Sequence, residues 1–263
     1  MLIRSIENPL VDGIQFPGFP NADIQKGFVG SSNQTTLEEA YHFFRLVKRY
    51  AVAFGKKFTH ENYNFLDFGC GWGRFLRFFQ KDINPKNIYG VDVDPNIINT
   101  CRDLGFICNL SPINPTGLLP YKEHFFDCII AYSVFTHLPE NVHQHWLKEL
   151  SRVSKPGCVI ALTLESIRFL DFISSIDETL SLSRWHEKLA KFKDKIEKMK
   201  LDFNQGKFVY LPTGGGAYRD SNTYGDAAVP LSYIERHWVH DFNIIEYIDD
   251  GSFWQAVLVV QKK

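Results

Sequence analysis

Three glycines at alternate positions and two aspartates form the pattern in this sequence that could bind a ligand. Gly69, Gly71 and Gly73 follow Asp67 in the run Asp-Phe-Gly-Cys-Gly-Trp-Gly, and Asp92 lies 19 residues after Gly73. Glycine permits positive φ angles and lets a ligand approach the backbone closely. The free amides that open a following helix suit an anionic or carboxylate group. A carboxylate at Asp92 can accept both hydroxyls of a ribose held over such a turn, although a helix-capping or solvated aspartate is the alternative.

A strand, a tight turn and a helix must position the glycines, and the flanking sequence predicts all three. Apolar residues at 65–68 run into the glycines, and apolar residues at 75–79 recur after them at helical spacing. A second predicted strand, 87–92, ends at Asp92, and Asp94 and Pro95 then begin a helix. Further strands are predicted at 106–108, 127–133 and 158–164, with a helix over 142–153. Repeated βα units predict a mostly parallel sheet with right-handed crossovers.

The remaining segments predict additions to this α/β core. We expect an N-terminal arm or flap (1–34), a cofactor-binding core (35–165), a helical lid with a Gly-rich loop (166–229), and a C-terminal helix and β-hairpin that complete the core (230–263). Apolar residues at steps of three and four predict one long amphipathic helix over 182–203, which could instead form a dimer seam. Asp249-Asp250-Gly251 joins two apolar runs as a hairpin turn.

Composition excludes several classes of protein. The chain has 263 residues, 44% of them hydrophobic, and a formal net charge of −1, so no basic field attracts nucleic acid. Its five cysteines include no C-x-x-C pair, which argues against a disulfide framework and a thiolate zinc site. No apolar run of about 18 residues and no leader pattern occurs. We therefore expect a cytoplasmic protein with no metal and no membrane segment.

Successive motifs resemble one enzyme family along most of the chain. They are Leu-Asp-Phe-Gly-Cys-Gly-Trp-Gly-Arg (66–74), Tyr-Gly-Val-Asp-Val-Asp-Pro (89–95), Leu-Pro-Tyr before Phe-Asp (119–127), Ser-Val-Phe-Thr-His-Leu-Pro (133–139) and Lys-Pro-Gly (155–157). Together they resemble the class I S-adenosylmethionine (SAM)-dependent methyltransferases, in the bacterial small-molecule, type 11/12-like group associated with glycan or secondary-metabolite pathways. The resemblance implies a Rossmann-like fold, mostly parallel with a C-terminal antiparallel hairpin, plus a helical lid insertion.

The resemblance also implies roles for particular residues around SAM, whose product is S-adenosylhomocysteine. Asp67 and the glycine turn (Gly69, Cys70, Gly71 and Gly73) would hold the methionine part. Asp92 would take the ribose, Val93 would pack on adenine, and Asn109 and Leu110 would meet the adenine edge. Ala131 and Tyr132 would face the methionine end and the acceptor.

The chemistry requires little beyond alignment of the acceptor with an activated methyl group. A hydroxyl acceptor would also need a base, and His137 is the candidate, because imidazole titrates near neutrality. A structural histidine that ties the following turn is the alternative reading. Glu165, Tyr218, Arg219 and Tyr224 are candidates for holding the acceptor, and each could equally be a surface or packing residue.

We therefore expect an O-methyltransferase that acts on a small polar acceptor, most simply a hydroxyl of a sugar-like, glycan or secondary-metabolite precursor. It would be a monomer, or a homodimer through the 182–203 helix. Two alternatives stay open: a SAM-binding scaffold without turnover, and a nicotinamide-dependent oxidoreductase, whose G-x-G-x-x-G motif would need the third glycine one residue later.

Overall fold

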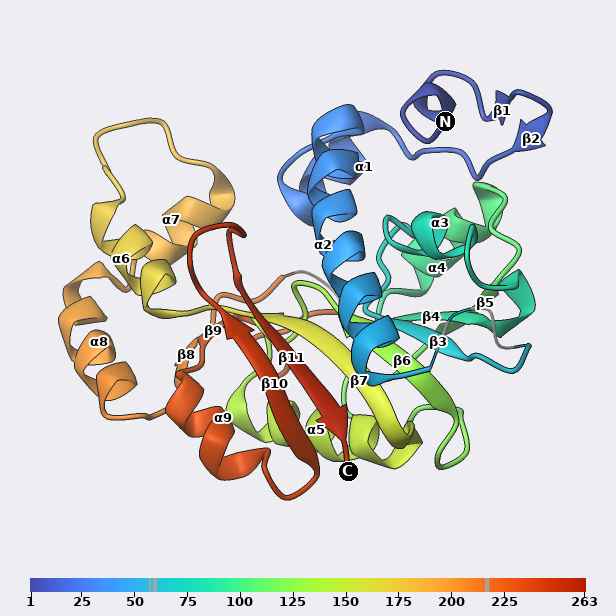
Figure 1. The fold of residues 1–263 in the computed structure, drawn as a ribbon. Helices are drawn as coiled ribbons and strands as arrows, with labels where there is room; N and C mark the ends of the chain where they lie inside the picture. The colour runs from blue at the N-terminus through green and yellow to red at the C-terminus, as the bar shows by residue number, and fades with distance from the viewer. Residues whose placement is uncertain (57, 59–60, 216–217) are drawn as a thin grey trace. The chain divides into compact units, whose positions relative to one another are not determined.

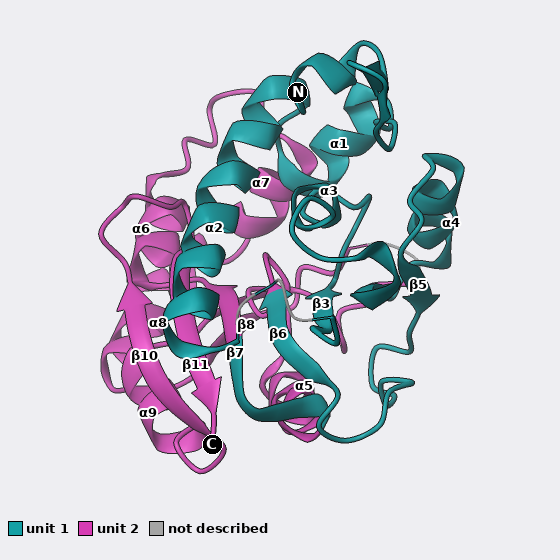
Figure 2. Cartoon of the chain, turned by 45° about the vertical axis from the view of Figure 1, so that its right-hand side comes forward, with its two compact units in different colours: residues 1–130, 153–159 teal, residues 131–152, 160–263 magenta. Residues whose placement is uncertain are grey.

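The computed structural model describes residues 1–56, 58, 61–215 and 218–263, so Gly216 of the predicted Gly-rich loop lies outside the described residues. The chain forms two compact units (Figure 1). Unit 1 comprises residues 1–130 and 153–159, and unit 2 comprises residues 131–152 and 160–263 (Figure 2). Each unit is therefore described by itself.

Unit 1 holds the parallel part of the sheet, in the strand order β7-β6-β3-β4-β5. The register is fixed at the centre, where β3 pairs in parallel with β4 (Asp67 with Gly90) and with β6 (Asp67 with Ile130). All residues of β3 and β6 are buried, as expected of parallel strands covered on both faces. The elements are η1 (Arg4–Ile6), β1 (Leu10–Val11), β2 (Ile14–Gln15), α1 (Ala22–Val29), α2 (Asn33–Phe54), β3 (Phe65–Phe68), α3 (Leu76–Phe79), η2 (Pro85–Asn87), β4 (Ile88–Asp92), α4 (Pro95–Asp103), β5 (Asn109–Pro112) and β6 (Phe126–Ala131).

Aromatic side chains hold α2 and α3 against the sheet in unit 1. The ring of Phe65 in β3 stacks on that of Phe79 in α3, with centroids 3.9 Å apart. Phe44 of α2 packs on Phe78 and Phe79 at 5.5 and 5.0 Å. This packing fixes the short helix that begins directly after the glycines.

Unit 2 contains the later part of β7, the lid helices and the C-terminal hairpin. In the sheet β11 lies between β7 and β10, and β10 pairs antiparallel with β11 (Ile244 with Val260). The expected fold class, a mostly parallel α/β sheet with a C-terminal antiparallel hairpin, is confirmed. The elements are α5 (Glu140–Val153), β7 (Ser154–Leu164), α6 (Ile167–Ser175), α7 (Arg184–Ala190), η3 (Lys193–Lys195), α8 (Ile196–Asn204), β8 (Val209–Leu211), β9 (Asp226–Ala228), α9 (Leu231–His237), β10 (Phe242–Ile248) and β11 (Ala256–Lys262).

The single long helix predicted over 182–203 is wrong. The segment forms α7, the 3-10 turn η3 and α8. Part of its apolar stripe is nevertheless buried, because Leu189, Ile196 and Phe203 all enter a hydrophobic cluster with residues of α6, β8 and β9. No glycine or proline marks the break between 184 and 204, so the sequence pattern could not reveal it. This cluster occupies Leu189, Ile196 and Phe203, whereas Trp185 of the same stripe is 36% exposed.

One other expectation about the elements was also wrong. The third strand is β5, Asn109–Pro112, and not 106–108. The ring of Phe106 instead packs against Gly73, so this residue belongs to the support of the glycine turn. The N-terminal arm contains a regular helix, α1, capped by the Asn21 side chain, which accepts from the Ile24 amide.

Among the helices of the described part, none is both long enough and apolar enough to span a bilayer.

Candidate functional site

The glycine turn lies between β3 and α3 in unit 1, and hydrogen bonds to β4 hold it. The amides of Gly69 and Cys70 both donate to the Val91 carbonyl, at 2.8 and 2.9 Å. Gly69, Gly71 and Gly73 have φ angles of +79°, +50° and +82°, which side chains rarely tolerate. The turn therefore depends on all three glycines.

Two aromatic residues line the outside of this turn. A Cβ atom added at Gly73 would lie 2.5 Å from the Phe106 ring, so no side chain fits there. A Cβ atom at Gly71 would lie 3.4 Å from Phe28 of α1. The arm is anchored nearby, since the buried Arg77 guanidinium donates to the carbonyls of Pro17 and Gly18. Helix α1 thus places Phe28 beside the glycines.

Asp67, at the carboxyl-terminal end of β3, is a buried carboxyl with an unused oxygen. It is 1% exposed, and its Oδ2 atom has no hydrogen-bond partner among the described residues. Burial raises the pKa of Asp67 to about 8; Arg74 opposes the rise, and Asp92 adds to it. Arg74 itself is held by Glu39 of α2 at 3.0 Å. A cationic ligand group would relieve this buried carboxyl.

Asp92, the last residue of β4, joins the glycine turn to the start of α4. Its Oδ2 atom accepts from the Gly71 amide at 3.0 Å, and its Oδ1 atom accepts from the Asp94 amide at 3.0 Å. An ionised carboxylate offers about four acceptor positions. Val93 follows it, half-buried. The two aspartates and the glycines are therefore brought together, as the sequence predicted.

The structure does not bring Asn109 to the edge of the sheet where Asp92 lies. Asn109 pairs with Tyr89, near the start of β4, and its side chain donates to the carbonyls of Lys86 and Ile88. Leu110 pairs with Gly90 and is buried. The residue level with Asp92 is Pro112, the last residue of β5, and the amide of Ile113, just after the strand, donates to the Asp92 carbonyl at 2.9 Å. The misplaced third strand caused this error.

The other residues predicted around the cofactor have simpler positions. The Cys70 thiol is buried against the Cys101 thiol, a hydrogen bond that raises its pKa, so Cys70 offers its backbone to a ligand. Ala131 is the last residue of β6, one position past Ile130, and Tyr132 follows it; both are buried.

His137 lies in unit 2, where a backbone carbonyl fixes its tautomer. The Nδ1 atom is 2.7 Å from the Gly225 carbonyl oxygen. Because a carbonyl can only accept, Nδ1 carries the proton and Nε2 of the neutral ring carries the lone pair. The side chain keeps 18% exposure, and Nε2 is 3.5 Å from Ser133 Oγ. Nε2 is thus the ring nitrogen that can accept a proton.

Asp226, which begins β9, stands next to the protonated side of this imidazole. Its Oδ1 atom is 3.4 Å from His137 Nδ1 and accepts from the Trp185 indole at 3.3 Å. Its Oδ2 atom accepts from the Thr213 hydroxyl at 2.6 Å. Asp226 is 2% exposed, so its charge would act on the ring with little screening.

A second set of hydrogen bonds holds Glu165 and Ser133 on the other side of the site. The Gln255 amide donates to Glu165 Oε1 at 3.0 Å and to Ser133 Oγ at 3.1 Å. The Thr163 hydroxyl donates to Gln255 Oε1 at 2.7 Å, which sets the orientation of the amide. Burial raises the pKa of Glu165 to about 7, while Gln255 and His137 oppose the rise. Ser133 has a φ angle of +56°, a strained conformation of the kind found at functional sites.

Of the four residues predicted to hold the acceptor, the structure brings three to His137. Besides Glu165, the ring of Tyr224 stacks on the imidazole with centroids 4.5 Å apart. The guanidinium of Arg219 lies over the Tyr224 ring at 5.5 Å. Tyr218 is 45% exposed and makes no hydrogen bond or ring contact with the described residues.

Sequence reasoning missed Asp226, Gln255, Trp185 and Ser133. The only available signal was a polar residue in an unusual place. Asp226 follows Gly225 in a Gly-rich loop, and Gln255 stands at the start of an apolar run. Their partners lie far away in sequence, which no local pattern encodes.

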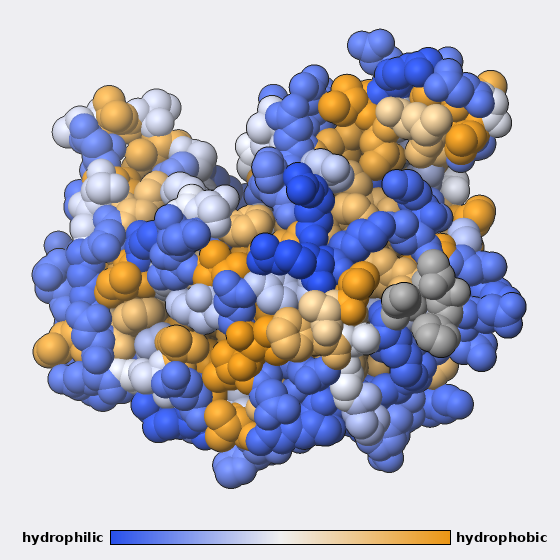
Figure 3. All heavy atoms as spheres, viewed as in Figure 1, coloured by the Kyte–Doolittle hydropathy of each residue, from blue (hydrophilic) through white to orange (hydrophobic). Residues whose placement is uncertain are grey.

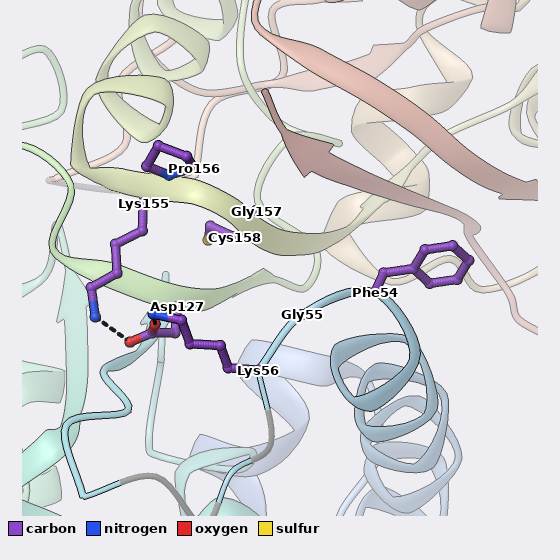
Figure 4. Close-up of a pocket in the computed structure, with 8 residues that line it drawn as sticks. All are labelled: Phe54, Gly55, Lys56, Asp127, Lys155, Pro156, Gly157 and Cys158. Atoms are coloured by element: carbon purple, nitrogen blue, oxygen red, sulfur yellow. Dashed lines mark hydrogen bonds and ion pairs between the residues drawn. The ribbon is translucent and has the colours of Figure 1, made fainter.

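A pocket of about 200 Å³ lies elsewhere in unit 1, and its charges are satisfied internally (Figure 4). Lys155 and Lys56 both pair with Asp127, whose Oδ2 atom also accepts from the Asn64 amide. Asp127 is near the amino-terminal end of β6, whereas Asp67 and Asp92 are at the carboxyl-terminal ends of their strands. We therefore assign this pocket a structural role. Its lining is Phe54, Gly55, Lys56, Asp127, Lys155, Pro156, Gly157 and Cys158.

Comparison with known proteins places residues 66–162 in the methyltransferase domain family. The fold is similar to the PH0226 protein of Pyrococcus horikoshii (TM-score 0.57, 15% identity, 88% of this chain and 91% of that chain covered). It is also similar to an S-adenosylmethionine-dependent methyltransferase of Clostridium acetobutylicum (TM-score 0.57, 14% identity, 91% of this chain and 96% of that chain covered). A putative S-adenosylmethionine-dependent methyltransferase of Listeria monocytogenes is similar as well (TM-score 0.56, 10% identity, 86% of this chain and 99% of that chain covered). At these low sequence identities the structural similarity shows a shared fold and nothing further.

The residues at the ends of β3 and β4 fit SAM. The unpartnered Oδ2 atom of Asp67 suits the α-ammonium of its methionine part, because a buried carboxylate without a counter-charge is otherwise unfavourable. The positive φ angles leave the backbone of Gly69 and Gly71 open to close approach. Asp92, the last residue of β4, carries a carboxylate of the kind that accepts from ribose hydroxyls. The donor set therefore matches the cationic and sugar parts of the cofactor.

Proposed function

We propose that this chain is a class I SAM-dependent methyltransferase and that it transfers a methyl group to a hydroxyl of a small, sugar-like acceptor; the methyltransferase domain matched at residues 66–162 and the fold support this. The acceptor would be a glycan or secondary-metabolite precursor, and unit 2 would bind it at His137.

One observation carries this proposal: the hydrogen bond from His137 Nδ1 to the Gly225 carbonyl. It leaves the lone pair of the neutral ring on Nε2. A purely structural histidine would be expected to use both nitrogens in short hydrogen bonds, whereas the contact of Nε2 with Ser133 is long, at 3.5 Å.

Bound SAM supplies a methyl group already activated by its sulfonium, and the residues of unit 2 would supply the proton transfer. The acceptor would lose its hydroxyl proton in the transfer, and His137 Nε2 would accept that proton. The resulting imidazolium would be stabilised by Asp226, at 3.4 Å from Nδ1. Ser133 and Glu165 would hydrogen-bond the acceptor, since Gln255 fixes both.

The charges around His137 support a neutral, hydroxyl-bearing acceptor. Two buried carboxyl groups, Asp226 and Glu165, lie on this site. Glu165 would accept a hydrogen bond from a hydroxyl of the acceptor, while Asp226 would act on the imidazole from its Nδ1 side. A neutral polyol adds no negative charge beside these carboxyl groups, whereas a carboxylate or phosphate at the reacting end would be repelled.

The variant His137→Asn tests the role of the base. The asparagine amide can still donate to the Gly225 carbonyl but cannot accept the proton. Release of S-adenosylhomocysteine would be measured with a panel of methyl glycosides and inositols. With an acceptor that the wild-type enzyme methylates, we expect kcat to fall roughly 10²- to 10⁴-fold, with little change in SAM affinity.

His240→Asn is the matched control, because His240 is an exposed histidine of the same unit and should tolerate the change. An unchanged kcat in His137→Asn would eliminate the base. Tight SAM binding without any S-adenosylhomocysteine release across the panel would favour the scaffold alternative instead.

A further inference from the structure

Three aromatic side chains of unit 2 form a cluster that we call the aromatic platform: Phe172 of α6, Trp185 of α7 and Trp254 of the loop between β10 and β11. Phe172 is at its centre. Its ring is stacked with that of Trp185 (centroids 5.8 Å, planes 20° apart) and meets that of Trp254 edge to face (5.4 Å, 80°). In Figure 1 the loop from β10 to β11 extends toward α6 and α7. The platform therefore joins residues distant in sequence.

The tryptophans of the platform are exposed, unlike the others of the chain. Trp254 is 59% exposed and Trp185 is 36% exposed, whereas Trp72, Trp146 and Trp238 are at most 2% exposed. The nearby loop adds Leu180, at 65%, and the surface over α6 and α7 shows apolar residues among hydrophilic ones (Figure 3). Large aromatic side chains left in water favour a ligand that covers them.

The platform is continuous with the residues around His137. On one side, the Trp185 indole donates to Asp226, which stands beside His137 Nδ1. On the other side, Trp254 directly precedes Gln255, whose amide holds Ser133 and Glu165. A molecule with a hydroxyl at His137 would thus extend over the platform.

We propose that the platform binds a flat aromatic group carried by the methyl acceptor, so that the acceptor is an aryl glycoside or similar compound rather than a free sugar. This deepens the proposed function and rests on it. The acceptor's hydroxylated ring lies at His137 and Glu165, and its aromatic ring stacks on the exposed indoles. Arg168, a cation near the loop, is already paired with Asp249 at 2.7 Å.

The size of the platform favours a small molecule over a protein partner. A stable protein interface covers about 800 Å² on each side. Complete burial of one aromatic side chain covers only ~150 to 250 Å², and these three rings already cover one another in part. Their remaining surface matches one or two ligand rings.

The experiment compares phenyl β-D-glucopyranoside with methyl β-D-glucopyranoside on the S-adenosylhomocysteine-bound protein. The two probes share the sugar and differ in the aromatic ring. Titrations followed by saturation-transfer NMR give both affinities. We expect the phenyl compound to bind roughly threefold to tenfold more tightly. It should also protect the wild-type tryptophan fluorescence from iodide, because the exposed fluorophores are Trp185 and Trp254.

Trp254→Ala should abolish this preference without changing the affinity for the methyl compound. Leu201→Ala is the matched control: Leu201 is 57% exposed on α8 of the same unit and is not part of the platform. Equal affinities of the two glucosides in the wild-type protein, no binding of the phenyl compound, or a preference that survives in Trp254→Ala would overturn the proposal.

These results are separable from the test of the base. Loss of the phenyl preference with a functioning His137 would leave methyl transfer to a hydroxyl intact. A phenyl preference in a protein that never releases S-adenosylhomocysteine would instead preserve the platform and remove the enzymatic function.

Discussion

Binding of SAM should release a proton from Asp67. The carboxyl is buried, its Oδ2 atom has no partner in the described part of the chain, and burial raises its pKa to about 8. At about pH 7 roughly nine-tenths of the free protein therefore carries this proton. A contact with the α-ammonium of SAM requires the ionised form, so binding must displace the proton.

The size of the effect follows from this pKa. Below it, the ionised fraction falls about tenfold per pH unit, which costs about 1.4 kcal/mol of binding free energy per unit. SAM should thus bind about tenfold more weakly at about pH 6 than at about pH 7, with roughly 0.9 proton released at the higher pH. The α-amino group of the ligand stays largely protonated in this range, because its ordinary pKa is about 8.

Titration calorimetry in two buffers of different ionisation enthalpy measures both quantities. The variant Asp67→Asn should bind SAM more weakly, with no proton release and no dependence on pH in this range. The variant should remain folded. In the wild-type protein the pKa of Asp67 is higher in the folded than in the unfolded state, so ionising Asp67 lowers the stability as the pH rises from about 4 to about 8. The uncharged amide of asparagine removes that loss. Wild-type affinity equal at both pH values, without proton release, would refute the assignment.

Two further predictions concern stability. Gly73→Ala should lower the free energy of unfolding in urea by about 2 to 4 kcal/mol, because it combines a positive φ angle with a clash against Phe106. Gly105→Ala should lower it by only about 1 kcal/mol, because Gly105 has a φ angle of +84° but no atom within 4 Å of the added Cβ. Equal losses in the two variants would contradict the clash. Burial lowers the pKa of His143 to about 3, and His237 adds to this shift. The free energy of unfolding of the wild-type protein should therefore fall by up to about 1.4 kcal/mol per pH unit as the pH is lowered from about 6.5 to about 3. His143→Phe should remove that slope and His145→Phe should keep it; slopes that match in both variants would contradict the assignment.

Local patterns were sufficient for the cofactor end of the molecule. A glycine at every second position after an apolar strand, with Asp92 at the end of the next strand, requires only neighbouring residues in one βα unit, so spacing alone placed Asp67, Asp92 and the turn together. The position of Asn109 was not predicted correctly, because it depends on strand pairing and not on neighbouring residues. Whether it belongs to a strand depends on pairing with Tyr89, and pairing register is not visible in a short apolar run.

The sequence by itself determined the α/β class, the glycine turn and the candidate base, because periodicity and turn chemistry act over a few residues. Only the tertiary structure decided what surrounds His137. Gly225 and Asp226 come from a segment almost ninety residues later, and Gln255 comes from the last hairpin. A buried polar residue is stable only where folding supplies its partner, and that partner is set by long-range packing rather than by the residues beside it.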